Sequence, residues 1–158
     1  MWDRMLGRGA GQLLAFMLEP DADSLAEAMV AFANADGGTI LIGVDETGRA
    51  SGDVYADEVE IALRAAVQQC RPVVDARWHE AAAEDGLAFA IVVPRSPELH
   101  SLVDGRVLIR AGTDNRPLSG GEIRQLAATK STGDFVFLNA SGAHRDDLLF
   151  AFSVGVID

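Results

Sequence analysis

The chain has 158 residues, of which 49% are hydrophobic, and a formal net charge of −11 at pH 7. This apolar content excludes a disordered chain, and no apolar run reaches the ~20 residues needed to span a bilayer. The acidity argues against a broad, sequence-independent phosphate-binding surface, because such binding grows with the number of phosphates neutralised.

The length favours one domain with short flanking segments. Residues 1–12 are rich in glycine and are expected to form a flexible amino-terminal segment. Residues 13–130 hold the regular patterns of the domain, and residues 131–158 form a carboxyl-terminal extension. The single cysteine, Cys70, rules out an internal disulfide and fits a reducing compartment, so a cytoplasmic location is expected.

The first half of the domain predicts a strand, a helix and a second strand. Leu13–Leu18 is a short apolar strand, and Ser24 with Glu27 forms a capping box that opens a helix. Its apolar stripe has the helical period, and Gly37-Gly38 ends it by allowing positive φ; the stripe is Leu25, Met29, Phe32 and Ala33. Thr39–Ile42 has no polar alternation, which is typical of a strand covered on both faces.

The middle of the chain predicts a hairpin and a second helix. Asp45–Gly48 is a turn that reverses the chain into residues 49–52. Asp57 and Glu60 form a cap pair for a helix over residues 57–70, in which Cys70 fills the core. The buried stripe of this helix is Val59, Leu63, Ala66, Val67 and Cys70.

The rest of the chain predicts more strands and a third helix. Residues 73–80 and 87–93 are strands, and residues 99–110 are two strand-like arms around an Asp104-Gly105 turn. Ser119 and Glu122 open a helix, and apolar runs at 135–138 and 148–157 are expected to be strands. Interleaved hairpins predict an α+β (mixed α/β) fold: a mixed, mostly antiparallel sheet with three helices packed on it and a strand-rich carboxyl-terminal tail.

Three segments together resemble the Schlafen-type AlbA-like domain, also described as a divergent AAA-type or DNA-binding domain. AFANADGGTILIGVDETGRASG (31–52) is similar to the family's A-F-A-N-T-x-G-G and G-V-D-D core. VLIRAGT (107–113) is similar to its Y-V-R-x-G-S/T segment, and LSGGEIRQL (118–126) to the helix start that follows. The resemblance runs in order over residues 10–128, and it implies a bacterial regulatory or defence protein or, for the nuclease members, a metal-dependent ribonuclease.

The resemblance also implies where a nuclease site would lie. The nuclease members carry three carboxylates, two in the first strand and one after G-V-D, together with a lysine. Here Ala10 and Ala15 stand in place of the glutamates and Met17 in place of the lysine, which leaves Glu46 beside Asp45. One carboxylate does not organise a cation that takes six or more oxygen ligands. We therefore expect no metal site, and no cofactor unless the nuclease alternative holds, in which case a divalent cation is needed.

Charge is unevenly distributed along the chain. Residues 1–94 carry 6 basic and 16 acidic groups, whereas residues 95–130 carry 6 basic and 4 acidic groups. Any polyanion is expected to dock weakly and in a salt-sensitive manner on the second segment, through Arg106, Arg110, Arg116 and Arg124. A structural role for Arg110, paired with an acid such as Asp45, is the competing interpretation.

Three functions stay open at this point. The first is a non-catalytic binding module, for nucleic acid or for a protein partner, in transcription or defence. The second is a Schlafen-like metal-dependent ribonuclease, and the third is a structural assembly domain. The apolar segment 148–157 is expected to be covered by protein, either by its own domain or by a second chain, and a homodimer is expected. No membrane association is expected, because no apolar run is long enough to span a bilayer.

Overall fold

The structure is a computed structural model that describes residues 9–51, 53–83 and 86–140. Its central feature is a four-stranded sheet in the order β1-β2-β5-β4. The strands are β1 (Leu14–Met17), β2 (Gly38–Ile42), β5 (Gly86–Val93) and β4 (Arg77–Ala83). β1 pairs with β2 in parallel, and the other two pairings are antiparallel. The expected mixed, mostly antiparallel sheet is therefore confirmed.

Two small antiparallel ladders flank the main sheet. β3 (Cys70–Arg71) pairs with β6 (Ser101–Leu102), and β7 (Leu108–Ala111) pairs with β8 (Asp114–Pro117). The two arms expected around Asp104-Gly105 thus belong to different ladders. The turn itself is present, because the Gly105 amide donates to the Leu102 carbonyl at 2.8 Å.

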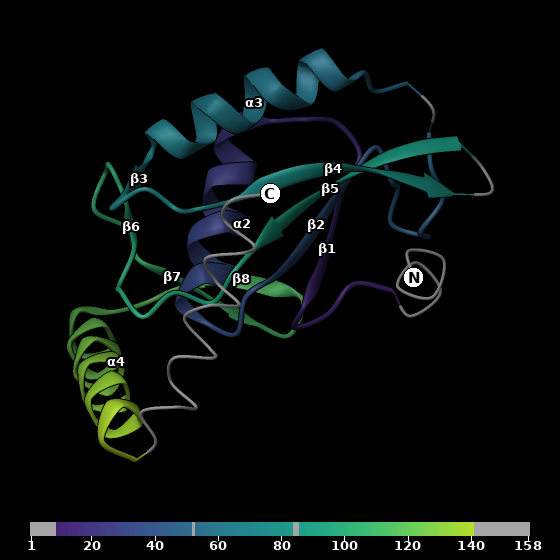
Figure 1. Ribbon diagram of the computed structural model, residues 1–158. Helices are drawn as coiled ribbons and strands as arrows, with labels where there is room; N and C mark the ends of the chain where they lie inside the picture. The colour runs from purple at the N-terminus through teal and green to yellow at the C-terminus, as the bar shows by residue number, and fades with distance from the viewer. Residues whose placement is uncertain (1–8, 52, 84–85, 141–158) are drawn as a thin grey trace.

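Three helices lie in the described part of the chain: α2 (Ala22–Asn34), α3 (Ala56–Gln68) and α4 (Gly120–Ala140). Figure 1 shows α3 running along one side of the sheet, α2 between α3 and the β7–β8 hairpin, and α4 standing beside that hairpin. None of these helices is long and apolar enough to cross a membrane.

The helix starts correct part of the sequence analysis. α2 begins three residues early, because Asp21 rather than Ser24 is the N-cap and accepts the Ser24 amide at 2.9 Å. In α3 the reciprocal acid is Glu58, which accepts the Tyr55 amide at 3.0 Å, so the predicted pair of Asp57 and Glu60 is wrong. Only the third box is confirmed. Ser119 donates its amide to Glu122 at 3.0 Å and accepts the Glu122 amide on its hydroxyl at 3.3 Å.

Other boundaries also differ from prediction. Residues 73–76 lie outside the sheet, because a tight turn joins the Ala76 amide to the Val74 carbonyl at 3.0 Å. The apolar run 135–138 lies in α4 rather than in a strand, since a run this short has no period that separates helix from strand. The expected strand at 148–157 and residues 1–8 of the expected flexible segment lie outside the described residues.

The core has two layers, one on each face of the sheet. The larger cluster joins α2 and α3 to one face, and α2 is buried along nearly its whole length. The four stripe residues predicted for α2 are all fully buried: Leu25, Met29, Phe32 and Ala33. Cys70 belongs to the same cluster, as expected of core filler, although it lies in β3 just after α3. Burial raises the pKa of its thiol to about 11, which keeps it protonated and unreactive.

Candidate functional site

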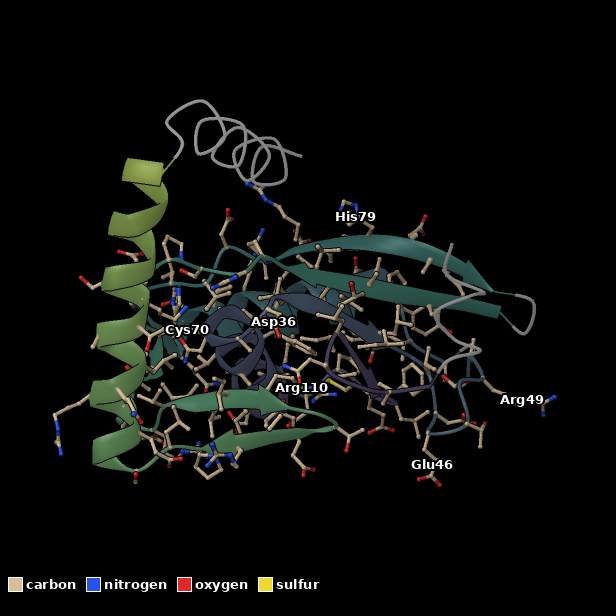
Figure 2. The ribbon with its side chains drawn as sticks, turned by 90° about the horizontal axis from the view of Figure 1, so that it is seen from below. Asp36, Glu46, Arg49, Cys70, His79 and Arg110 are labelled. Carbon is tan, nitrogen blue, oxygen red and sulfur yellow. The ribbon has the colours of Figure 1, made fainter. Side chains whose placement is uncertain are left out.

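The Asp45–Gly48 turn is built by the Asp45 carboxylate. Its Oδ1 accepts the Thr47 hydroxyl at 2.6 Å, the Thr47 amide at 2.9 Å and the Arg49 amide at 3.0 Å. These hydrogen bonds, that of the Thr47 side chain first, lower the pKa of Asp45 below its usual range. Glu46 is exposed and points away from the body at the rim of the molecule (Figure 2). Asp45 therefore has a structural role, and Glu46 is the accessible acid of the pair.

A cavity of about 670 Å³ lies against the edge strand β1. Its lining includes the three positions at which the sequence differs from the nuclease members, which are Ala10, Ala15 and Met17. It also includes Glu46, the one acid that remains at a position of their site. These positions are separated by up to 36 residues in sequence, and the reversal at Gly11–Leu14 together with the parallel pairing of β1 and β2 brings them together.

The residues around this cavity do not fit a hard divalent cation. Besides Glu46, the carboxylates that line it are Asp45 and Glu27. Asp45 is used by its own turn, and Glu27 Oε2 pairs with Arg106 Nη1 at 2.7 Å. Among the described residues, no group of three or more His, Cys, Asp or Glu is arranged to hold a metal ion. The alanines leave the cavity wall without the oxygen ligands that such a cation requires.

Arg110 lies in the interior, with 5% of its surface exposed. Its guanidinium donates to the Gly11 carbonyl from Nε at 3.0 Å and from Nη2 at 2.8 Å, and to the Leu14 carbonyl at 2.9 Å. Nη1 donates to Asn115 Oδ1 at 2.9 Å, and the guanidinium carbon lies 4.8 Å from the centre of the Phe32 ring. Arg110 thus clamps the start of β1 to the β7–β8 hairpin through backbone carbonyls, not through Asp45. Figure 2 shows it near the centre of the view, and it is also one of the residues that line the cavity beside β1.

The other three candidate arginines are exposed but differ in their partners. Arg106 Nη1 pairs with Glu27 at 2.7 Å, and Arg106 Nε pairs with Asp104 at 2.9 Å. Two carboxylates therefore offset the positive charge of Arg106. Arg116 pairs with Glu122 at 3.1 Å. Arg124 makes no ion pair with any residue that the structure describes. Arg116 is the third residue of β8 and Arg124 is the fifth residue of α4, and we call these two residues the α4 corner.

Three polar residues position these elements and were not singled out from the sequence. Asn34 Nδ2 donates to the His100 and Leu108 carbonyls at 2.9 Å each, which ties α2 to β7. Gln12 Nε2 donates to the Arg110 carbonyl at 2.9 Å, and Lys130 of α4 donates to the Ser96 carbonyl at 2.6 Å. Asn34 belongs to the A-F-A-N motif, and this was the one signal in the sequence that could have pointed to it.

Comparisons with known proteins bear on this arrangement. A family model described as Schlafen, AlbA_2 matches residues 15–119, about two-thirds of the chain. The chain belongs to this family. Its Schlafen AlbA_2 domain runs from β1 to Ser119, so segments 31–52 and 107–113 lie inside the matched region and segment 118–126 begins at its end. The family points to a nucleic-acid-related module. No curated protein matches the chain.

The comparison with solved structures supports the same fold. The crystal structure of the DIP2311 protein from Corynebacterium diphtheriae is similar with a TM-score of 0.57 and 21% sequence identity. The match covers 73% of this chain and 23% of that protein, so the chain spans about a quarter of its length. At this identity the likeness concerns the fold alone.

Proposed function

We propose that this Schlafen AlbA_2 domain is a non-catalytic module that binds nucleic acid in transcription or defence. One observation carries the non-catalytic part. The cavity that gathers Ala10, Ala15, Met17 and Glu46 has methyl and thioether groups where the nuclease members of the resemblance have carboxylates and a lysine. Water attack on a phosphodiester requires a cation or base at that place, and Glu46 alone does not hold one.

The binding part rests on the α4 corner. Arg116 and Arg124 are exposed, lie eight residues apart at the junction of β8 and α4, and belong to the segment with the most favourable charge balance. Arginine forms bidentate contacts to phosphate oxygens, and such contacts are screened by salt. Glu122 competes for Arg116, so the proposed binding is weak. Burial excludes Arg110 from this surface, and its two carboxylate partners make Arg106 a minor contributor.

The test uses labelled single-stranded RNA and DNA, with and without Mg²⁺ or Mn²⁺, and reads binding by fluorescence anisotropy and cleavage on a gel. The double variant Arg116→Glu, Arg124→Glu is expected to bind much more weakly. The slope of log affinity against log salt is expected to become shallower by about 0.7 per lost phosphate contact. Glu122→Gln removes the competing charge and is expected to strengthen binding.

The matched control is Arg64→Glu, because Arg64 is an exposed arginine of α3 that pairs only with Glu60 four residues away among the described residues. It is expected to leave affinity unchanged. Unchanged binding after reversal of the α4 corner would reject this surface. Metal-dependent cleavage that disappears in Glu46→Ala would instead establish the ribonuclease alternative.

We further propose that the protein acts as a homodimer. Residues 148–157 are almost wholly apolar and rich in aromatic and β-branched side chains, so they need cover from protein. Pairing of this segment between two chains supplies that cover and presents two α4 corners to one nucleic acid. A protein partner that covers the same segment is the competing outcome.

A further inference from the structure

The loop between β5 and β6 places a serine hydroxyl against a histidine ring. Ser96 Oγ lies 2.8 Å from His100 Nε2, and His100 Nδ1 lies 2.8 Å from the Pro72 carbonyl oxygen. Because a carbonyl only accepts, the neutral ring carries its proton on Nδ1, and Nε2 accepts the proton of the Ser96 hydroxyl. A hydroxyl, a base within hydrogen-bond distance and a third group that orients the base are the parts of an activated nucleophile.

The end of α2 holds this arrangement in place. The Ser96 amide donates to the Ala33 carbonyl at 3.0 Å, and the His100 amide donates to Asn34 Oδ1 at 2.8 Å. Ala33 and Asn34 are the last two residues of α2, so the serine and the histidine are both fixed to one helix end. This reduces the entropy that must be lost before a proton passes between the two side chains.

The surroundings of His100 favour its neutral form. The residue is 3% exposed, and this burial lowers the pKa of the ring. The Pro72 carbonyl and Glu98 raise the pKa by smaller amounts, and Lys130 lowers it. At neutral pH the ring is therefore unprotonated at Nε2 and able to take the proton of Ser96.

Ser96 is the more accessible member of the pair. It is half-buried, and Arg95, Pro97 and Glu98 around it are exposed. Its Oγ accepts the Glu98 amide at 3.1 Å, and its carbonyl accepts Lys130 Nζ at 2.6 Å. An N–H dipole and a positive charge thus lie beside the serine, and both favour the negative charge that develops when its hydroxyl attacks a carbonyl group.

We propose that Ser96 is a nucleophilic serine that takes an acyl group from activated esters, with His100 as its general base. Ser96 Oγ attacks the ester carbonyl carbon and forms a carbon–oxygen bond, while the hydroxyl proton moves to His100 Nε2. The bond from that carbon to the leaving oxygen then breaks, the leaving group departs with the electron pair, and His100 gives the proton to it or to water. The site shares no residue with the cavity beside β1 or with the α4 corner, so it does not depend on the binding of nucleic acid.

The third group sets the expected speed of this reaction. The Pro72 carbonyl orients the ring, but it does not offset the positive charge that the ring gains with the proton. A buried carboxylate in that place does both, so acylation of Ser96 is expected to be slower than in a Ser-His-Asp triad.

Acetylation by p-nitrophenyl acetate tests the proposal, with nitrophenolate release followed by absorbance and the acetylated residue located by tandem mass spectrometry. Ser101 is the internal reference, because it is half-buried like Ser96 and its hydroxyl donates to the Arg71 carbonyl at 3.4 Å rather than to a base. General base catalysis contributes about 10²–10⁴-fold, so Ser96 should react at least about 100-fold faster than Ser101. Ser96→Ala should abolish the fast release, and Ser101→Ala should leave it unchanged.

Two further measurements assign the role of the base. His100→Gln, checked for folding by circular dichroism, should slow the reaction of Ser96 to the rate of Ser101, whereas His79→Gln on the exposed side of β4 should not change it. In the unaltered protein the rate should rise with pH as His100 loses its proton and reach a plateau near neutral pH. A rate at Ser96 no greater than at Ser101, a rate unaffected by His100→Gln, or a rise with pH without a plateau overturns the proposal.

Discussion

At the scale of single residues, buried polar side chains hold the loops to the helices. His100 is 3% exposed, and its backbone amide donates to Asn34 Oδ1 at 2.8 Å. Its ring lies between the Pro72 carbonyl, 2.8 Å from Nδ1, and the Ser96 hydroxyl, 2.8 Å from Nε2. A carbonyl only accepts, so neutral His100 carries its proton on Nδ1 and accepts the Ser96 proton on Nε2. Lys130 binds the Ser96 carbonyl, which connects α4 to the same cluster.

This arrangement predicts a pH dependence of stability. Burial lowers the pKa of His100, so the unfolded chain binds a proton at a higher pH than the folded chain does. The free energy of unfolding should therefore fall as the pH drops below the unfolded value of about 6.5, and level off below the folded pKa. Thermal unfolding from pH 8 to pH 5 should show this slope in the unaltered protein and a flatter one in His100→Gln.

His79 provides the control for this measurement, because it is exposed on β4 and points outward in Figure 2. His79→Gln should keep the slope of the parent protein. An equal flattening in both variants would mean that the slope does not come from burial of His100.

At the scale of elements, the fold depends on the close approach of α2 and β2 at Gly37-Gly38. Gly37 has φ of +75°, and its amide donates to the Phe32 carbonyl at 2.8 Å, which ends the helix as the sequence predicted. A Cβ at Gly38 would lie 2.5 Å from two atoms of the buried Phe32 ring and 2.9 Å from the Leu13 carbonyl oxygen. The first residue of β2 therefore has no space for a side chain.

Gly38→Ala should accordingly lower the free energy of unfolding by about 1–3 kcal/mol, the usual cost of overpacking a core. Gly120→Ala is the matched control, because the nearest atom to its Cβ is 3.7 Å away at the end of the Arg124 side chain, in the first turn of α4. That variant should be neutral or slightly stabilising. Urea denaturation of both variants measures the contrast, and equal midpoints would show that Phe32 moves aside without cost.

At the scale of the whole molecule, α4 joins the domain to the carboxyl-terminal segment. Its described side chains are half-buried or exposed, and Lys130 fixes it to the body. Because the helix runs to Ala140, a deletion after Lys130 would cut through it, whereas deletion of residues 141–158 leaves it whole. The second deletion therefore separates the tail from the helix.

Deletion of residues 141–158 should abolish self-association, measured by light scattering at micromolar concentration, because the proposed dimer forms through residues 148–157. Phe152→Asp should have the same effect, and the neighbouring Ser153→Asp should act more weakly, since serine brings less apolar surface to the contact. A full-length monomer, or an unchanged dimer after the deletion, would exclude the tail as the interface.

The sequence by itself determined the features that depend on hydrophobic periodicity and on residues that start or stop a helix. The α2 stripe, the Gly37 stop, the two-sided burial of β2 and the Ser119–Glu122 box all depend on residues close together in the chain, and each was predicted correctly. The motifs in register also identified the family. The resemblance pointed to Ala10, Ala15, Met17 and Glu46, which the fold brings to one cavity.

Only the tertiary structure decided which side chains are accessible and what they bind. Arg110 and Arg124 are both arginines in the same basic segment, yet one is buried by carbonyls that lie nearly 100 residues away in sequence and the other is exposed at a helix start. The sequence analysis also misassigned the N-caps of α2 and α3, because several neighbouring residues are equally able to cap a helix. It misassigned residues 135–138, because an apolar run this short fits a helix as well as a strand. Long-range packing decides between these local alternatives, because burial and hydrogen-bond partners depend on the whole folded chain.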